Sequence, residues 1–234
     1  PSVITPERFT RMVLTAISSN KDLQQCTPES FLGAMMQAAQ LGVEPNTPLG
    51  QAYILPYKDH GVLKAQFQIG YKGLIDLAYR SGDVSIVDAH VVYKNDSFEY
   101  ELGIDPKLHH RPALIDRGIP IAVYGMFRTK YGGFGFQVMS MDDIRKHAQK
   151  WSKSYSSPYS PWTTNFEEMA KKTVLKKALK YAPLKSDFAR GIATDGTVKS
   201  QISEDMMYNV DNEISYVESD VVVDESTGEV IENV

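Results

Sequence analysis

Cysteine is almost absent from this sequence of 234 residues, and no run of apolar residues is long enough to span a membrane. The lone Cys26 excludes a disulfide framework and a thiolate metal cluster, and it favours a reducing cytoplasm as the location. No segment has the pattern of a signal peptide or of the phosphate-binding loop G-x-x-x-x-G-K-[S/T], so neither an ATP site nor any other cofactor is predicted. The chain begins with proline rather than methionine, as expected of a trimmed piece of a longer protein.

Basic residues are missing from the C-terminal end of the chain. Residues 201–234 contain ten acids and no lysine or arginine, whereas residues 1–200 carry all 25 basic residues against 19 acids, a net charge of +6. The overall net charge of −4 therefore describes neither part. We expect residues 1–200 to form a single basic domain. Residues 201–234 are expected to form an acidic tail that is extended and mobile or docks a partner protein.

Helix and strand signals alternate along the basic part. The start signal Thr-Pro-Glu occurs at 5–7 and at 27–29, and it predicts two N-terminal helices. Further helices are expected at 70–80, 141–150 and 162–182. Three hairpins are expected, pairing 51–57 with 64–69, 85–93 with 98–102, and 121–128 with 134–140. Order is expected to weaken after residue 183. The predicted fold is α+β: an antiparallel sheet of β-hairpins packed with helices, then a long basic C-terminal helix and the acidic tail.

The segment 162–182 is the most informative, because its predicted helix has two long faces of different chemistry. Lysines spaced four residues apart form one ridge: Lys172, Lys176 and Lys180. Apolar residues occupy the opposite side: Val174, Leu175, Ala178 and Ala182. Just upstream, residues 151–162 are rich in aromatic and hydroxyl side chains. A cationic ridge beside such a loop suits the phosphates and bases of a nucleic acid, although lysines on one helix face are also typical of an ordinary solvated surface.

Residues 68–82, Gln-Ile-Gly-Tyr-Lys-Gly-Leu-Ile-Asp-Leu-Ala-Tyr-Arg-Ser-Gly, resemble the signature of the RecT family of phage single-strand annealing proteins, which are recombinases. The similarity continues through 30–57 and 160–173, covers roughly residues 5–195, and is greatest to RecT proteins from phages of Gram-positive bacteria. The resemblance implies a protein that is not an enzyme and that anneals DNA without ATP. It implies that the protein coats single-stranded DNA and pairs complementary strands in the host cytoplasm. The annealed duplex is then held by its backbone in a homo-oligomeric ring or helical filament during phage homologous recombination.

The predicted DNA contacts combine cations of the hairpins and of the C-terminal helix with residues of the family motifs. They are Lys58, Lys64, Tyr71, Lys72, Arg128, Lys130, Lys153, Trp162, Thr164, Lys171, Lys172, Lys176 and Lys180. Tyr71 and Lys72 lie where a strand meets a helix N-terminus, which suits a phosphate. Three alternatives stay open: a core position for Tyr71, a loop anchor rather than a base-stacking ring for Trp162, and simple solvation of the isolated hairpin cations. Backbone contacts should dominate, because annealing must accept any sequence.

Two other functions are open from the residues alone. A metal-dependent nuclease would use the carboxylates that begin two predicted helices, Asp142, Asp143, Glu167 and Glu168. A protein-interaction scaffold would act through the acidic tail, for which a phage exonuclease and the host single-strand-binding protein are the expected partners.

Two smaller expectations concern metal binding and self-association. The adjacent His109 and His110 are not expected to form a metal site, because neighbours in a strand point to opposite faces. The N-terminal helices are the candidate contact between copies, through the apolar residues Phe9, Val13, Phe31 and Met35.

Overall fold

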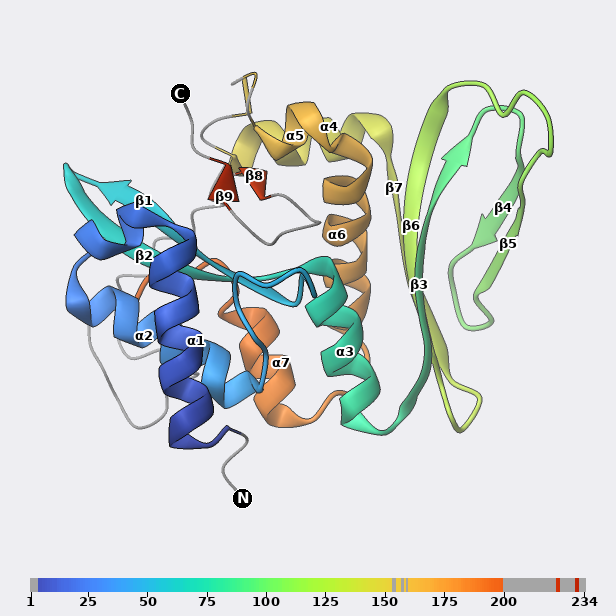
Figure 1. Ribbon diagram of the computed structural model, residues 1–234. Coiled ribbons are helices and arrows are strands. Elements are labelled where there is room, and N and C mark those ends of the chain that lie inside the picture. Colours follow the sequence, from blue (N-terminus) through green and yellow to red (C-terminus); the bar gives the residue numbers. More distant parts are fainter. Residues whose placement is uncertain are drawn as a thin grey trace. The chain divides into compact units, whose positions relative to one another are not determined.

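Helices and antiparallel strands alternate along the chain, so the α+β class is confirmed (Figure 1). The computed structural model describes residues 4–152, 155–156, 158, 160–199, 222–223 and 230–231. The helices are α1 (Pro6–Ser19), the 3-10 helix η1 (Lys21–Gln25), α2 (Pro28–Leu41), α3 (Tyr71–Ser81), α4 (Met141–Trp151), α5 (Pro161–Thr164), α6 (Phe166–Leu179) and α7 (Ser186–Ala193). The strands are β1 (Ala52–Asp59), β2 (Val62–Ile69), β3 (Val84–Tyr93), β4 (Ser97–Glu101), β5 (Lys107–Arg111), β6 (Pro120–Thr129), β7 (Phe134–Ser140), β8 (Val222–Val223) and β9 (Val230–Ile231). They form small separate sheets, β1–β2, β3–β6–β7, β4–β5 and β8–β9, in place of one continuous sheet.

Internal packing divides the chain into two compact units. The first contains the described residues of Pro1–Leu77, Trp151–Thr164 and Lys185–Val234. The second contains Ala78–Lys150 and Asn165–Leu184. Each unit has a buried core of its own, centred on residues such as Ile54 and Phe67 in the first unit and Val123 and Leu175 in the second. The chain passes between the units four times: within α3, at the end of α4, between α5 and α6, and between α6 and α7.

In the first unit, α1 and α2 begin where the Thr-Pro-Glu signals predict. Proline occupies the first turn of each helix, and the Thr5 hydroxyl accepts the backbone N–H of Arg8 at 3.3 Å. α2 ends at Gly42, whose φ of 65° is the left-handed conformation that glycine adopts without a Cβ clash. The β1–β2 hairpin is also confirmed, and its turn places His60 and Gly61 at positive φ.

The first unit also contains a helix that the sequence pattern did not predict. α7 packs against α2, and the segment after α7 is buried, with Thr194 and Asp195 at most 4% exposed. The Asp195 carboxylate accepts the backbone N–H of Ile69 at 2.6 Å, and the Gln66 side chain donates to the Gly196 carbonyl. The expectation that order weakens after residue 183 is therefore wrong as far as residue 199, because polar groups of this segment hydrogen-bond to β2.

The second unit is built on the sheet β3–β6–β7, with β6 in the centre. The β6–β7 hairpin is confirmed, with Val123 aligned to Met139. The expected pairing of 85–93 with 98–102 is wrong: β3 pairs with β6, and β4 pairs with β5 in a register that aligns Phe98 with His110. The error has a physical reason, since β5 (Lys-Leu-His-His-Arg) is too polar to show the apolar alternation that marks a strand.

The two faces of this three-stranded sheet are covered by different elements (Figure 1). Gly125 of β6 faces α6, and a Cβ there would lie 2.9 Å from the Cα of Leu175, so glycine is needed for the helix to approach this closely. The neighbouring Tyr124 points to the other face. There its ring stacks on Phe98 with 5.7 Å between centroids and meets His110 at 5.5 Å. α6 and the β4–β5 sheet therefore lie on opposite faces of β3–β6–β7.

The single helix predicted over 162–182 is in fact two helices. α5 is only four residues long, and α6 begins at Phe166. Asn165 separates them with φ −133° and ψ 48°, values outside the helical region. α6 ends one residue before Lys180, which still has helical angles as the C-cap, φ −61° and ψ −23°. The lysine spacing is thus retained, but Trp162 belongs to the first unit and the lysines belong to the second.

Most of the acidic tail lies outside the described residues, so the expectation that the tail is mobile concerns residues that the structure does not describe. The described part is a short antiparallel pair in which β8 aligns Val222 with Ile231 of β9. Among the helices that the structure describes, none combines the length and the apolar character needed to cross a membrane.

Candidate nucleic-acid interface

Helix α6 presents a row of lysines because its other side belongs to the core of the second unit. The buried residues of α6 are Ala170, Thr173, Val174, Leu175, Ala178 and Leu179. Lys172 and Lys176 follow at the i, i+4 spacing and are half-buried, whereas Lys180 is exposed. Successive lysines of this row are about 6 Å apart along the helix axis, so the row can contact more than one phosphate of a strand. The row is called the α6 ridge below.

Lys171 lies beside the α6 ridge and has a partner of its own. Its ammonium is 2.7 Å from the Glu168 carboxylate, an i, i+3 ion pair in the first half of the helix. Glu167 accepts a hydrogen bond from the Tyr93 hydroxyl at 2.9 Å, and burial together with this contact raises the pKa of that hydroxyl. Both acids occupy the first turn, where the helix dipole favours negative charge. The rest of α6 carries no acid, so its positive field is concentrated toward its C-terminal end.

In the first unit, the Gly-Tyr-Lys-Gly segment at the start of α3 is shaped by close backbone contact. Gly70 donates its N–H to the Gln51 carbonyl at 2.9 Å. A Cβ on Gly70 would overlap the Gly50 carbonyl oxygen, and a Cβ on Gly73 would overlap the Gln51 carbonyl oxygen. Both glycines are therefore required for the chain at 50–51 to cross the start of α3.

This crossing fixes the surroundings of Lys72. A Cβ placed on Gly50 would lie 3.4 Å from the Lys72 Cδ and 3.2 Å from the Tyr53 hydroxyl, so the lysine stem passes over the glycine beside that hydroxyl. Lys72 is exposed, and Tyr71 before it is half-buried. An exposed lysine in the first turn of a helix suits a phosphate, because the helix dipole and the ammonium act in the same direction.

The other two candidate cations of the first unit lie near the tip of the β1–β2 hairpin. Lys58 is exposed, whereas the Lys64 ammonium is 3.0 Å from the Asp59 carboxylate. Hydrogen bonds from Lys64 and then from His60 hold the pKa of Asp59 below its ordinary value. Lys72 follows the other end of β2, so about 20 Å of hairpin separates it from Lys58. The structure does not bring these cations into one cluster.

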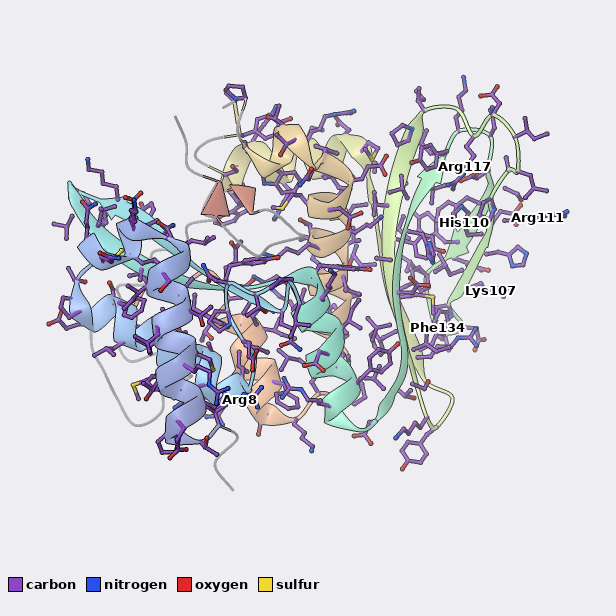
Figure 2. The ribbon with its side chains drawn as sticks, viewed as in Figure 1. Arg8, Lys107, His110, Arg111, Arg117 and Phe134 are labelled. Carbon is purple, nitrogen blue, oxygen red and sulfur yellow. The ribbon has the colours of Figure 1, made fainter. Side chains whose placement is uncertain are left out.

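Arg128 and Lys130 of the second unit do not join the α6 ridge. By the alternation of β6, Arg128 points to the face that holds the β4–β5 sheet rather than to α6. There it lines a cavity of about 680 Å³ together with Phe134, which Figure 2 labels, and with Glu99 and Glu101. Lys130 is exposed in the β6–β7 turn. Lys107 also lines this cavity, so the two acids offset the two basic residues and the cavity has no excess of positive charge to attract a phosphate.

The aromatic motif offers less exposed surface than expected. Trp162 is 3% exposed, which favours its role as a loop anchor over a base-stacking ring. Thr164 is exposed, and its hydroxyl donates to the Ser160 carbonyl at 3.2 Å. Lys153 lies outside the described residues. The predicted contacts are therefore dispersed: a row on α6, a pair at the start of α3, and single cations on the hairpins.

Comparison with known proteins assigns the chain to a family. The profile of the RecT family matches residues 7–217. The chain belongs to the RecT family. It is 39% identical over 199 residues to "Protein RecT" of Escherichia coli (strain K12), an alignment covering 83% of this chain and 73% of that protein. It is 29% identical over 202 residues to "Uncharacterized protein YqaK" of Bacillus subtilis (strain 168), covering 83% of this chain and 66% of that protein. Membership of the RecT family makes the chain a single-strand annealing protein of DNA recombination.

In this RecT protein, the acids considered for a nuclease have structural partners. Asp142 lies 2.6 Å from the Lys146 ammonium, and this hydrogen bond lowers the pKa of Asp142. The Ser140 hydroxyl accepts the backbone N–H of Asp143 at 3.0 Å and donates to its carboxylate at 2.7 Å, which is the geometry of a helix cap. The two acids of α6 bond to a tyrosine and a lysine, as described above. Within the described part of the chain, no group of three or more His, Cys, Asp or Glu side chains is placed to hold a metal ion.

A buried charge cluster beside the β4–β5 sheet was not predicted. The Asp96 side chain has no exposed surface. Its carboxylate accepts two hydrogen bonds from the Arg117 guanidinium, at 3.0 and 2.6 Å, and lies 3.0 Å from a ring nitrogen of His110. Figure 2 labels Arg117 and His110. Against the opposing effect of burial, Arg117 and then the backbone N–H groups of Tyr93 and Ala113 hold the pKa of Asp96 well below its usual range. His110 and Arg117 follow Asp96 by 14 and 21 residues in the sequence, so no local sequence pattern indicates that this aspartate is buried and paired.

Proposed function

We propose that this RecT protein anneals complementary single strands without ATP and holds them by their phosphates. The α6 ridge is the observation that carries the proposal, because Lys172, Lys176 and Lys180 share one side of a helix whose other side is core. Phosphates are the same at every nucleotide, so such contacts accept any sequence, as annealing requires. The free energy of pairing comes from the bases themselves, about 1.4 kcal/mol per step, and nucleotide hydrolysis is not needed.

A second phosphate contact is proposed at the start of α3. Lys72 is exposed there, beside the Tyr53 hydroxyl and the helix N-terminus. Tyr71 is assigned a supporting role, since it is half-buried. The remaining predicted contacts are proposed as peripheral: Lys58, Lys64, Arg128, Lys130, Lys153, Thr164 and Lys171.

The proposal is tested by an annealing assay in which two complementary oligonucleotides, one carrying a fluorophore and one a quencher, are mixed with the purified chain. Quenching should be faster than spontaneous pairing in buffer that contains no nucleotide triphosphate, and added ATP should not change the rate. A strict requirement for ATP contradicts the proposal. Degradation of the strands that a chelator prevents would instead indicate a nuclease.

Assembly into a ring or a helical filament is the second part of the proposal. The α6 ridge of one copy extends about 12 Å from Lys172 to Lys180, which is short compared with the strands that recombination must align. Head-to-tail contacts between copies extend such a surface, giving a ring if they close and a filament if they do not. Images taken after complementary oligonucleotides are added in sequence should show regular assemblies on the duplex. Strictly monomeric complexes under conditions that support annealing would contradict this part.

The acidic tail is proposed to dock other recombination proteins, such as a phage exonuclease or the host single-strand-binding protein. Its ten acids and lack of basic residues exclude a direct contact with DNA phosphates. Truncation after Lys199 should leave annealing of purified oligonucleotides intact, keep or increase DNA affinity, and lower recombination in cells. Loss of annealing by a truncated protein that is still folded would show that the tail belongs to the DNA-binding surface.

The setting of this activity also stays a proposal: phage recombination in the cytoplasm of a bacterial host. An origin in a phage of a Gram-positive bacterium remains a prediction. The two relatives come from Escherichia coli and Bacillus subtilis, and the former has the higher identity, 39% against 29%.

A further inference from the structure

Large aliphatic side chains are exposed at both ends of the β4–β5 sheet. They are Leu102 (70%), Ile104 (99%), Leu114 (100%), Ile115 (87%) and Ile119 (67%), and together they are called the β4–β5 rim. Among the described residues, the next most exposed large aliphatic side chain is Leu14, at 61%. Single exposed leucines are normal on a protein surface, but five large aliphatic side chains that are each at least 67% exposed within eighteen residues of sequence mark a candidate contact surface.

The loop that carries three of these side chains is held rigidly. Asp96 accepts the backbone N–H of Ala113 at 2.9 Å at one end of the loop and the Arg117 guanidinium toward the other end. The Lys94 N–H bonds to the Ile119 carbonyl at 2.9 Å, and the Asn95 N–H to the Arg117 carbonyl at 3.1 Å. The aliphatic side chains are therefore presented by an anchored loop, so ordering this loop on a partner costs little conformational entropy.

The chemistry of this surface fits a protein better than a nucleic acid. The segment 97–121 carries four acids, Glu99, Glu101, Asp105 and Asp116. It carries three bases, Lys107, Arg111 and Arg117, and the last of these is already paired with the buried aspartate. A surface without net positive charge has no electrostatic attraction for DNA. Summed over the two ends of the sheet, the five aliphatic side chains present roughly 300–600 Å² of apolar surface, compared with about 800 Å² that each partner buries in a specific interface.

The position of the rim leaves the DNA surface accessible. β4–β5 lies on the face of β3–β6–β7 that Tyr124 points to, and α6 lies on the face that Gly125 points to. A partner on the rim and a DNA strand on the α6 ridge can therefore be bound at the same time. Of the four residues expected to mediate contact between copies, Phe31 and Met35 are 7% and 0% exposed and serve the core of the first unit, whereas Phe9 and Val13 are half-buried.

We infer that the β4–β5 rim is a contact surface for a second copy of this chain. This inference rests on the proposed function, because a strand longer than one α6 ridge must be shared between copies placed side by side. The rim has features that such a contact needs: exposed aliphatic side chains, three of them on an anchored loop, without net positive charge and on the far side of the sheet from the lysines.

The test compares the assembly of the full chain with that of variants, measured by sedimentation over a range of protein concentrations, with and without a long single strand. Leu114→Glu combined with Ile115→Glu should raise the concentration for half-assembly at least tenfold. Neither substitution removes a core contact, because these side chains are 100% and 87% exposed. Gln24→Glu combined with Gln25→Glu adds the same charge at exposed polar positions and should assemble like the unmodified chain. The neutral pair Leu114→Ser and Ile115→Ser should also weaken assembly, which separates lost apolar contact from added charge.

Three outcomes decide the matter. The inference is supported if only the rim variants lose assembly while still binding a short oligonucleotide with an unchanged salt dependence. It is overturned if the rim variants assemble like the glutamine control, or if Leu14→Glu in α1 disrupts assembly and the rim variants do not. Loss of oligonucleotide binding by the unmodified chain would count against the proposed function instead, and assembly measured without DNA would still test the rim.

Discussion

Removing the α6 ridge is the most direct perturbation of the proposed DNA contact. In the triple variant Lys172→Ala, Lys176→Ala and Lys180→Ala, the substituted side chains occupy the sector of α6 that its buried residues leave open, where Lys172 and Lys176 are half-buried and Lys180 is exposed. Alanine is also the residue with the highest helix propensity, so α6 should form as before. The expected effect is on binding, provided that losing the two half-buried stems leaves the fold unchanged, and a circular dichroism spectrum matching that of the unmodified chain checks this condition.

The size of the effect follows from the number of phosphates that the ridge neutralises. Each lysine on a phosphate of single-stranded DNA contributes about 0.7 to the slope of log K against log salt concentration, so losing three lowers the slope by about 2. Between about 50 and about 200 mM salt, a slope difference of about 2 corresponds to about a 16-fold difference in affinity. The unmodified chain should thus lose about 16-fold more affinity than the variant over this range. The loss should be equal for strands of different sequence, because phosphates carry no sequence information.

Fluorescence anisotropy of a labelled oligonucleotide measures this slope directly. The matched control is the triple variant Lys21→Ala, Lys94→Ala and Lys185→Ala, which removes three exposed lysines that are not assigned to DNA contact. Both variants change the net charge equally, so any general effect of charge appears in both. A ridge variant whose slope equals that of this control would refute the assignment of α6 as the DNA-binding element.

Three further predictions concern the scaffold. Gly73→Ala should lower the free energy of unfolding in urea by about 2 kcal/mol or more, because the added Cβ overlaps the Gln51 carbonyl. Gly61→Ala is the comparison: its Cβ would meet no neighbouring atom, so only the positive φ should lower the free energy of unfolding, by about 1 kcal/mol. Equal losses in the two variants would contradict this reasoning. The folded-state pKa of Asp96 is held below the unfolded value of about 3.9, so its stabilising contribution is present above about pH 4 and is lost as pH falls further. The stability of Asp96→Asn should therefore depend less on pH below about 4 than that of the unmodified chain, and parallel curves would contradict this. Burial, and then a nearby carboxylate, raises the pKa of the Cys26 thiol to about 11. At pH 8 this thiol should therefore react with a thiol reagent about 100-fold more slowly in the native chain than in the unfolded chain. Equal rates would contradict this prediction.

Elements whose partners are close in the chain were predictable from the sequence. Helix caps and tight turns are determined within a few residues, so the starts of α1 and α2 and the hairpins β1–β2 and β6–β7 were predicted correctly. The opposite orientations of His109 and His110 are also confirmed, since the first is exposed and the side chain of the second is 5% exposed. The pairing of β3 with β6 was not predictable in this way. It joins segments separated by the whole β4–β5 sheet, so no local pattern encodes it.

The candidate site was predictable only where it depends on helical periodicity. The spacing of the α6 lysines is a local property, and the structure retains it. The surroundings of the other candidates are tertiary properties that a sequence pattern does not contain. Trp162 is buried, Lys64 is paired with Asp59, and Arg128 faces acids across a cavity. The break at Asn165 was also missed, although asparagine is favoured at the start of a helix and disfavoured inside one, so the residue did carry a local signal.

The RecT signature at 68–82 shows why a family motif and a binding site are different things. Three of its residues have no exposed surface and serve the packing of α3: Leu74, Leu77 and Ala78. Gly70 and Gly73 are needed because residues 50–51 cross the start of the helix and leave no room for a Cβ, so these glycines also serve packing. Of the five residues that open the signature helix, Lys72 is the exposed one. If the signature has a direct role in binding DNA, that role falls to this lysine, and the rest of the motif serves to hold its backbone in place.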